Sequence, residues 1–258
     1  MNNSMQKNNS ETMNNSILIE QQQYELYTVE DLEVWSALYK RQMNVATDTA
    51  YRHFAGQLKK LEFSADVIPD FKKTNELLQK LTGWTIYAVP GLIPNNLFFR
   101  FMVFKRFGAT TWLRKKEQLD YLEEPDMFHD VFGHVPLLAD PVIANYLLGL
   151  ARIAEKYLDN EEAVECISRL YWYTIEFGLV KEGWHTKIYG AGILSSIGEM
   201  QFVLSPKANR VPFNLYDILQ TPYIKDKFQE QYFVLESLGQ FKRIIIELDH
   251  FMRRKYSN

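Results

Sequence analysis

The 258-residue sequence has a single cysteine, Cys166, and no apolar run long enough to cross a membrane. One cysteine excludes an intramolecular disulfide. Because no charged-then-apolar secretory leader pattern is present either, we expect a reducing, cytoplasmic location. The formal net charge is only -3, which gives no reason to expect a nucleic-acid partner. Hydrophobic residues make up 47% of the chain, so one globular domain with a substantial core is expected.

Residues 1–23 are rich in Asn, Gln, Ser and Met and have few residues that could build a core. We therefore expect a disordered tail over 1–23 and a folded domain over 24–258. Order is predicted to begin at Thr28, a helix N-cap followed by apolar residues at helical spacing toward Leu61. A second helix is expected after Asp70.

The rest of the chain reads as further helices with a few short strands. Strands are expected at Thr85–Val89 and Gln231–Leu235, and helices from Asp140 to about Tyr157, over Glu161–Phe177 and over Phe241–Met252. The predicted fold class is mostly α with short β-strands (α+β).

Two of the five histidines, His129 and His134, lie five residues apart among apolar residues with carboxylates nearby. This combination favours a divalent metal site. On one α-helix, residues five apart are rotated by about 140° and could not meet one ion. Gly133 and Pro136 would let the chain leave the helix, so we expect a helix that ends near Phe132 and a His134 that swings back. The H-E-x-x-H zinc pattern is absent.

A histidine between Phe128 and Asp130 can also be a core imidazole paired with a carboxylate. A third ligand shifts the balance toward a metal. Glu176 is embedded in an aromatic run, and a buried glutamate requires a cation or a donor. Two imidazoles and one carboxylate form the facial triad of non-haem iron(II) oxygenases, but the same set also serves catalytic zinc.

Three longer motifs carry a resemblance to a known family. They are the E-E-P-D-x-x-H-D-x-x-G-H-V-P run at 123–136, Y-W-Y-T-I-E-F-G-L at 171–179 and Y-G-A-G-I-L-S-S-I-G-E at 189–199. Together they resemble the pterin-dependent aromatic amino acid hydroxylases, most closely the bacterial phenylalanine 4-monooxygenases. The resemblance implies a single catalytic domain of the aromatic amino acid hydroxylase type over 24–258. It further implies hydroxylation of L-phenylalanine to L-tyrosine with O2, tetrahydrobiopterin or another tetrahydropterin, and Fe(II) held by His129, His134 and Glu176.

The resemblance also assigns the pterin site. Backbone groups of a turn would bind the pterin edge, a phenylalanine would stack on its ring, and an acid would reach it through water. These roles fall on Gly91, Leu92, Ile93 and Asn95 for the turn, Phe98 for the stack and Asp130 for the acid. Asn95 replaces a serine of the animal enzymes.

The substrate site follows in the same way. Arg114 would bind the substrate carboxylate, for which a bidentate guanidinium is suited. Trp172 and Pro125 would line the ring pocket, and Gly192 would allow close backbone approach. Ser195 would hydrogen-bond an iron-bound histidine and fix its orientation.

Alternatives within and outside this family stay open. A tryptophan or tyrosine hydroxylase shares the family, although Trp172 favours phenylalanine or tyrosine, because the tryptophan enzymes carry a smaller phenylalanine there. Two hypotheses come from other functional classes. The protein could be a zinc-dependent hydrolase with the same ligands, or a catalytically inactive binding protein. The expected partner is the small-molecule substrate L-phenylalanine, with no nucleic acid and no membrane. A monomer is expected, because no long heptad pattern follows Tyr256.

Overall fold

The computed structural model describes residues 21–256 except 121, 123, 224 and 226. Most of the expected tail, residues 1–20, lies outside the described residues. Gln22 was also assigned to that tail, yet its side chain donates to the Pro69 carbonyl at 2.9 Å and accepts from the Phe71 N–H at 2.7 Å. These bonds join Gln22 to the folded part of the chain, and the expected division of the chain after residue 23 stays a prediction.

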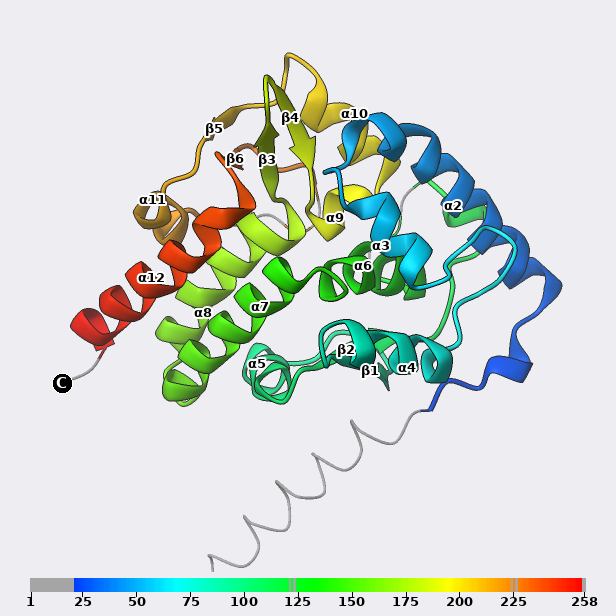
Figure 1. The fold of residues 1–258 in the computed structure, drawn as a ribbon, viewed down its shortest axis with the longest axis horizontal. Coiled ribbons are helices and arrows are strands. Elements are labelled where there is room, and N and C mark those ends of the chain that lie inside the picture. Colours follow the sequence, from blue (N-terminus) through cyan, green and yellow to red (C-terminus); the bar gives the residue numbers. More distant parts are fainter. Residues whose placement is uncertain (1–20, 121, 123, 224, 226, 257–258) are drawn as a thin grey trace, which may run out of the picture.

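Helices dominate the fold, as predicted (Figure 1). The α-helices are α2 (Val29–Thr49), α3 (Phe54–Lys60), α4 (Phe71–Leu81), α5 (Asn95–Val103), α6 (Val135–Leu138), α7 (Pro141–Ala154), α8 (Glu161–Tyr171), α9 (Ala191–Leu194), α10 (Ile197–Leu204), α11 (Leu215–Gln220) and α12 (Phe241–Tyr256). Among the described residues, the π-helices are η3 (Phe128–His134) and η5 (Trp172–Glu176), and the short 3-10 helices are η1 (Tyr24–Leu26), η2 (Lys116–Gln118), η4 (Glu155–Tyr157) and η6 (Leu238–Gln240).

Several helices begin directly after a residue whose side chain caps the helix. The Thr28 hydroxyl accepts from the Asp31 N–H, and Asp70 and Asp140 accept from residues in the first turns of α4 and α7. Each cap satisfies a backbone N–H that has no partner within the helix. The expected helical stretch toward Leu61 is interrupted, because Ala50 leaves α2 to bridge to Ile188.

In the part of the chain that the structure describes, the strands form two small sheets. β1 (Thr85–Val89) pairs in parallel with β2 (Arg106–Thr110), with Thr85 opposite Arg106. The second sheet has the order β4-β3-β6-β5, built from β3 (Leu179–Glu182), β4 (His185–Ile188), β5 (Arg210–Pro212) and β6 (Tyr232–Leu235). In Figure 1 the two sheets lie at opposite ends of the molecule, with α6, α7 and α8 between them.

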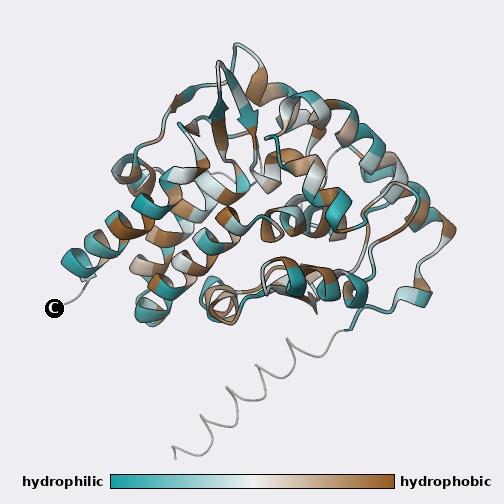
Figure 2. Cartoon of the chain, viewed as in Figure 1, coloured by the Kyte–Doolittle hydropathy of each residue, from teal (hydrophilic) through white to brown (hydrophobic). Residues whose placement is uncertain are grey.

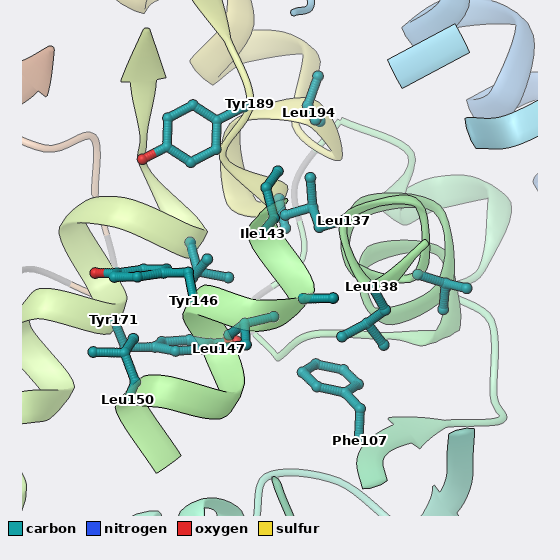
Figure 3. Packing of buried hydrophobic residues seen from close by; sticks show 14 of the residues in the cluster. Phe107, Leu137, Leu138, Ile143, Tyr146, Leu147, Leu150, Tyr171, Tyr189 and Leu194 are labelled. Carbon is teal, nitrogen blue, oxygen red and sulfur yellow. The ribbon is translucent and has the colours of Figure 1, made fainter. Parts of the chain in front are cut away.

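The core is built around α7. Nine of its fourteen residues are buried; in Figure 3, Ile143 lies beside Leu137 of α6, and Leu147 and Leu150 lie beside Tyr171 of α8. Surface helices bury one side only: α12 buries Phe241, Ile244, Leu248 and Met252 at helical spacing, and Figure 2 shows brown and teal alternating along it. Each such buried side chain contributes about 1.5–3 kcal/mol relative to an exposed one.

Among the helices of the described residues, no single one is both long and apolar enough to cross a bilayer. The pair Phe128–Leu138 and Pro141–Tyr157 meets that test only when taken together, across a bend of 102°.

Candidate active site

His129 and His134 both lie on the π-helix η3. The prediction that the helix ends near Phe132 was wrong: the chain stays helical and passes directly into α6. The i→i+5 hydrogen bonding of a π-helix widens each turn, so residues five apart come close to one face, which an α-helix would not allow. The two Nε2 atoms are 3.3 Å apart, with the imidazole rings edge to face.

Gly133 has a different role from the one expected. A Cβ at this position would lie 2.9 Å from the Ala191 carbonyl oxygen, so the glycine lets η3 pack closely against α9. It does not end the helix.

Glu176 is the last residue of the second π-helix, η5, which continues directly from α8. Its Oε1 lies 3.1 Å from His134 Nε2 and its Oε2 lies 3.7 Å from His129 Nε2. One donor atom from each of the three residues lies within 4.8 Å of the others. Donors that share one ion through bonds of about 2.1 Å are separated by about 3.0–3.4 Å, so this donor set fits a single divalent metal. Two imidazoles and one carboxylate on one side leave the other side open for further ligands.

The three side chains differ in exposure and in charge. His134 is 3% exposed, whereas His129 and Glu176 are 19% and 12% exposed, so the group can be reached from solvent. Burial lowers the pKa of His129 below its usual value, against the attraction of the Glu176 carboxylate. Burial acts in the same sense on His134, but the Glu176 carboxylate outweighs it and raises the His134 pKa. Burial opposes the charge on Glu176, yet the two histidines and Tyr171 hold its pKa below the usual range, so it remains an anionic ligand.

Ser195 determines which nitrogen of His129 is free to bind a metal. Its Oγ donates to the Ala191 carbonyl at 2.8 Å and lies 2.8 Å from His129 Nδ1. A hydroxyl has one hydrogen, so Ser195 accepts from Nδ1–H, and the lone pair of His129 is on Nε2. This is the nitrogen that faces His134 and Glu176, in agreement with the orienting role expected of Ser195.

Arg114 forms a buried ion pair that the sequence did not predict. Its Nε and Nη2 donate to the two carboxylate oxygens of Asp126 at 2.9 and 2.8 Å, and Asp126 is fully buried. Asp126 also accepts from the His129 backbone N–H at 3.1 Å. It therefore fixes the guanidinium relative to η3. Its position in the motif, directly after Pro125 and three residues before His129, was the available signal.

The ring of Phe107 lies between Phe98 and His134, a candidate metal ligand. The Phe98 ring meets Tyr171 edge on at 5.2 Å and Phe107 at 5.7 Å, and Phe107 is 4.9 Å from the His134 ring. Tyr171, which sequence reasoning missed, also hydrogen-bonds the Glu176 carboxylate. A buried tyrosine hydroxyl requires such a partner, but its identity depends on the tertiary fold.

Two other residues expected at the pterin, Asp130 and Asn95, hydrogen-bond residues outside the candidate ligand group. Asp130 is buried, and its Oδ2 accepts from both the N–H and the hydroxyl of Thr110 at 2.7 and 2.8 Å. Asn95 donates to Ser168 Oγ at 3.0 Å. Gly91, Leu92 and Ile93, also expected at the pterin, form the loop between β1 and α5, and Pro125, expected at the substrate ring, is partly exposed. Within the described residues, no hydrogen bond or ring contact joins any of these four residues to the three candidate ligands.

Trp172 and Gly192 lie on the other flank of Glu176. The Trp172 ring is stacked on Tyr223 at 4.7 Å and lies 4.9 Å from Phe177. A Cβ at Gly192 would be 3.1 Å from the Phe177 ring and 3.3 Å from Glu176 Oε2. Gly192 therefore lets the chain pack closely against both the Phe177 ring and the carboxylate of Glu176, a candidate metal ligand.

Residues 17–258 match the family described as biopterin-dependent aromatic amino acid hydroxylase. The chain belongs to this family. Phenylalanine-4-hydroxylase of Chromobacterium violaceum is 48% identical over 217 residues, which cover 83% of this chain and 72% of that protein. The predicted fold class of this chain, mostly helical with short strands in one catalytic domain of the hydroxylase type, is thus confirmed.

Solved structures of the Chromobacterium violaceum enzyme agree with this assignment. One, with bound iron(III) and oxidised cofactor 7,8-dihydrobiopterin, is 44% identical, covers 92% of this chain and 87% of its own, and has a TM-score of 0.85. Another, with iron and phenylalanine bound, is 41% identical, covers 92% and 88%, and has a TM-score of 0.83.

Proposed function

We propose that this protein is a phenylalanine 4-monooxygenase that converts L-phenylalanine to L-tyrosine with O2 and a tetrahydropterin at a mononuclear Fe(II). The observation that carries the proposal is the convergence of His129, His134 and Glu176, from two π-helices 38 or more residues apart in sequence, on one point. Its placement in a biopterin-dependent family, and the iron, dihydrobiopterin and phenylalanine bound by a relative, support the metal, the cofactor and the substrate. The catalytic domain is proposed to comprise residues 24–258.

His129, His134 and Glu176 would hold the iron, which, with the tetrahydropterin, supplies the two-electron activation of oxygen that no side chain can provide. The residues of this chain position the reactants. Ser195 keeps His129 in the tautomer that binds through Nε2. Tyr171 holds the Glu176 carboxylate by donating to it.

Phe98 is proposed to stack on the pterin, with the turn at Gly91, Leu92, Ile93 and Asn95 binding its edge and Asp130 reaching it through water. Phe98 is suited to this role because it is only half buried and lies one ring from His134.

Arg114 is proposed to bind the substrate carboxylate in an orientation that Asp126 fixes. Trp172, Pro125 and Gly192 would enclose the substrate ring. A flat, apolar substrate suits this place, because the aromatic rings of Trp172 and Phe177 contact each other beside Gly192. A ring held here and a carboxylate held at Arg114 would fix the substrate at both ends, and orientation of this kind is a large part of enzymatic rate enhancement.

The test is an assay of the purified, iron-loaded protein with tetrahydrobiopterin, O2 and each of phenylalanine, tyrosine and tryptophan. We expect tyrosine from phenylalanine, dependence on both O2 and pterin, and loss of activity when zinc replaces iron, since zinc has no redox chemistry. A preference for tryptophan or tyrosine would instead place the protein with another member of the family. Hydrolytic activity in the zinc form, without O2, would contradict the proposal.

We further propose that the protein acts as a monomer in the cytoplasm, without nucleic acid or membrane. The most exposed large apolar side chains in the described residues include Val29 at the start of α2, Leu92 in the loop before α5 and Trp184 in the turn between β3 and β4, and scattered apolar residues of this kind are ordinary on a monomer surface. Light scattering of the iron-loaded protein should give a mass near 30.4 kDa.

A further inference from the structure

Three rings form a continuous aromatic stack beside the candidate metal centre: Phe177, Trp172 and Tyr223. Trp172 is the middle member, tilted by 34° from Phe177 and by 25° from Tyr223. Gly192 packs closely against both the Phe177 ring and Glu176 Oε2. The plane of the Trp172 ring therefore helps to fix the Phe177 ring beside Glu176, a candidate metal ligand.

A single polar contact fixes the edge of the Trp172 ring. Its indole Nε1–H donates to Oε1 of Gln229 at 3.0 Å. Gln229 is 2% exposed, so water does not readily substitute for it. Gln229 belongs to the segment before β6, which is far from η5 in sequence.

Gln229 is held in turn by a buried carboxyl group. Glu199, in the first turn of α10, is 5% exposed and accepts from the Gln229 backbone N–H and from the Tyr232 hydroxyl. The Glu199 N–H is bound by the N-cap residue Ser196 at 3.3 Å, which fixes Glu199 on the helix. Glu199 thus attaches the segment before β6 to α10.

The same short stretch of chain reaches the metal site from the other direction. Ser195, four residues before Glu199, is the hydrogen-bond partner of His129 Nδ1. Residues 195–199 therefore contact a candidate metal ligand at one end and, through Gln229, the aromatic stack at the other.

We propose that Gln229 and Glu199 are positioning residues for the aromatic substrate: Glu199 holds Gln229, and Gln229 holds the Trp172 ring in the plane that receives the substrate ring beside the metal. This rests on the proposed hydroxylation of an aromatic amino acid. Neither residue is required to touch substrate or cofactor. Without the Gln229 oxygen, the indole N–H would be unpaired in a poorly hydrated place, and the ring would turn to find another acceptor.

The direct test is Gln229→Met, which keeps length and volume and removes the acceptor. The net value of one such hydrogen bond predicts a rise of about five- to tenfold in the phenylalanine KM, with the tetrahydropterin KM within about twofold of the wild type. The matched control is Gln231→Met, since Gln231, two residues further along, bonds only the surface residue Asn209. The control should leave both KM values unchanged.

A second measurement does not depend on activity. In zinc-loaded, diamagnetic protein labelled with 15N at the indoles, the five tryptophans give five Nε1–H signals, and Trp172→Phe identifies the one from Trp172. That signal should shift and exchange faster with solvent in Gln229→Met but not in Gln231→Met.

Glu199 is tested with a pair of variants. Glu199→Leu removes the acceptor of the Gln229 N–H and should reproduce both effects of Gln229→Met, whereas Glu199→Gln keeps an acceptor oxygen and should restore the wild-type phenylalanine KM and indole signal. An active wild type together with unchanged phenylalanine KM and indole signal in Gln229→Met would overturn the inference. A wild type that forms no tyrosine would instead contradict the proposed function, and the indole measurement would still report whether Gln229 holds Trp172.

Discussion

Glu199 should make the stability of this protein depend on pH in a predictable direction. Burial raises the pKa of its carboxyl from the usual 4.5 to about 7, although the hydrogen bonds from Tyr232 and Gln229 oppose the rise. The folded protein therefore binds the proton more tightly than the unfolded chain does. For such an acid, the stabilising contribution is complete below pH 4.5 and is lost as the pH rises toward 7.

The size of the effect follows from the same two values. Each pH unit between 4.5 and about 7 corresponds to about 1.4 kcal/mol, so ionisation of Glu199 should cost the folded state about 3 kcal/mol at pH 8 relative to pH 4. Glu199→Gln cannot ionise. The free energy of unfolding of this variant minus that of the wild type should therefore increase by about 3 kcal/mol between pH 4.5 and pH 8.

The assay is equilibrium urea unfolding of both proteins at several pH values, with the same metal loading. The control is Glu236→Gln, which removes an exposed carboxylate paired with Lys181 and should show a small and nearly constant difference. Parallel stability curves for the wild type and Glu199→Gln would refute the reasoning, because they would mean that Glu199 has the same proton affinity in the folded and unfolded chain.

Three further outcomes are expected at the site. Glu176→Ala should lower iron affinity by more than about a hundredfold, measured by metal titration, with an unchanged circular dichroism spectrum; full retention of iron would remove Glu176 from the ligand set. Arg114→Lys keeps a cation beside Asp126 but loses the fork, so steady-state kinetics should show the phenylalanine KM rising more than about tenfold and the pterin KM nearly constant. Ser195→Ala should cost about 10- to 100-fold in iron affinity by freeing the His129 ring, and an unaltered affinity would argue against the Nε2 tautomer.

The features that were predictable from sequence are those whose cause is local. Thr28 caps α2 as expected, and Asp70 and Asp140 cap the helices that were expected to begin beside them, because the acceptor side chain and the unpaired N–H groups are neighbours in the chain. His129, His134 and Glu176 were proposed as ligands because their residue types imply one chemistry, and the fold brings their donor atoms within 4.8 Å of one another.

The features that were missed arise from tertiary packing. No residue pattern distinguishes a π-helix from an α-helix at His129, so a break was expected where the helix in fact widens. Asp126, Tyr171 and Gln229 each hydrogen-bond a partner that is 12, 5 and 57 residues away, respectively. The sequence can suggest that each of these side chains is buried, but it does not show which group each side chain faces. Strands such as β5, with three residues, are too short for an alternating pattern to show.

Close packing against α9 explains how η3 and η5, which carry the three candidate ligands, can lie next to each other although both are π-helices. Gly133 of η3 packs against Ala191, the first residue of α9. Gly190, directly before it, has no room for a Cβ, which would lie 2.4 Å from the Glu176 carbonyl oxygen at the end of η5. Ser195, directly after α9, bonds His129. Residues 190–195, which are α9 and its two flanking residues, thus touch η3, η5 and the ring of His129, a candidate metal ligand. Because a packed interior does not deform continuously, the spacing between the histidine pair and the glutamate is set by how closely these glycines allow α9 to approach.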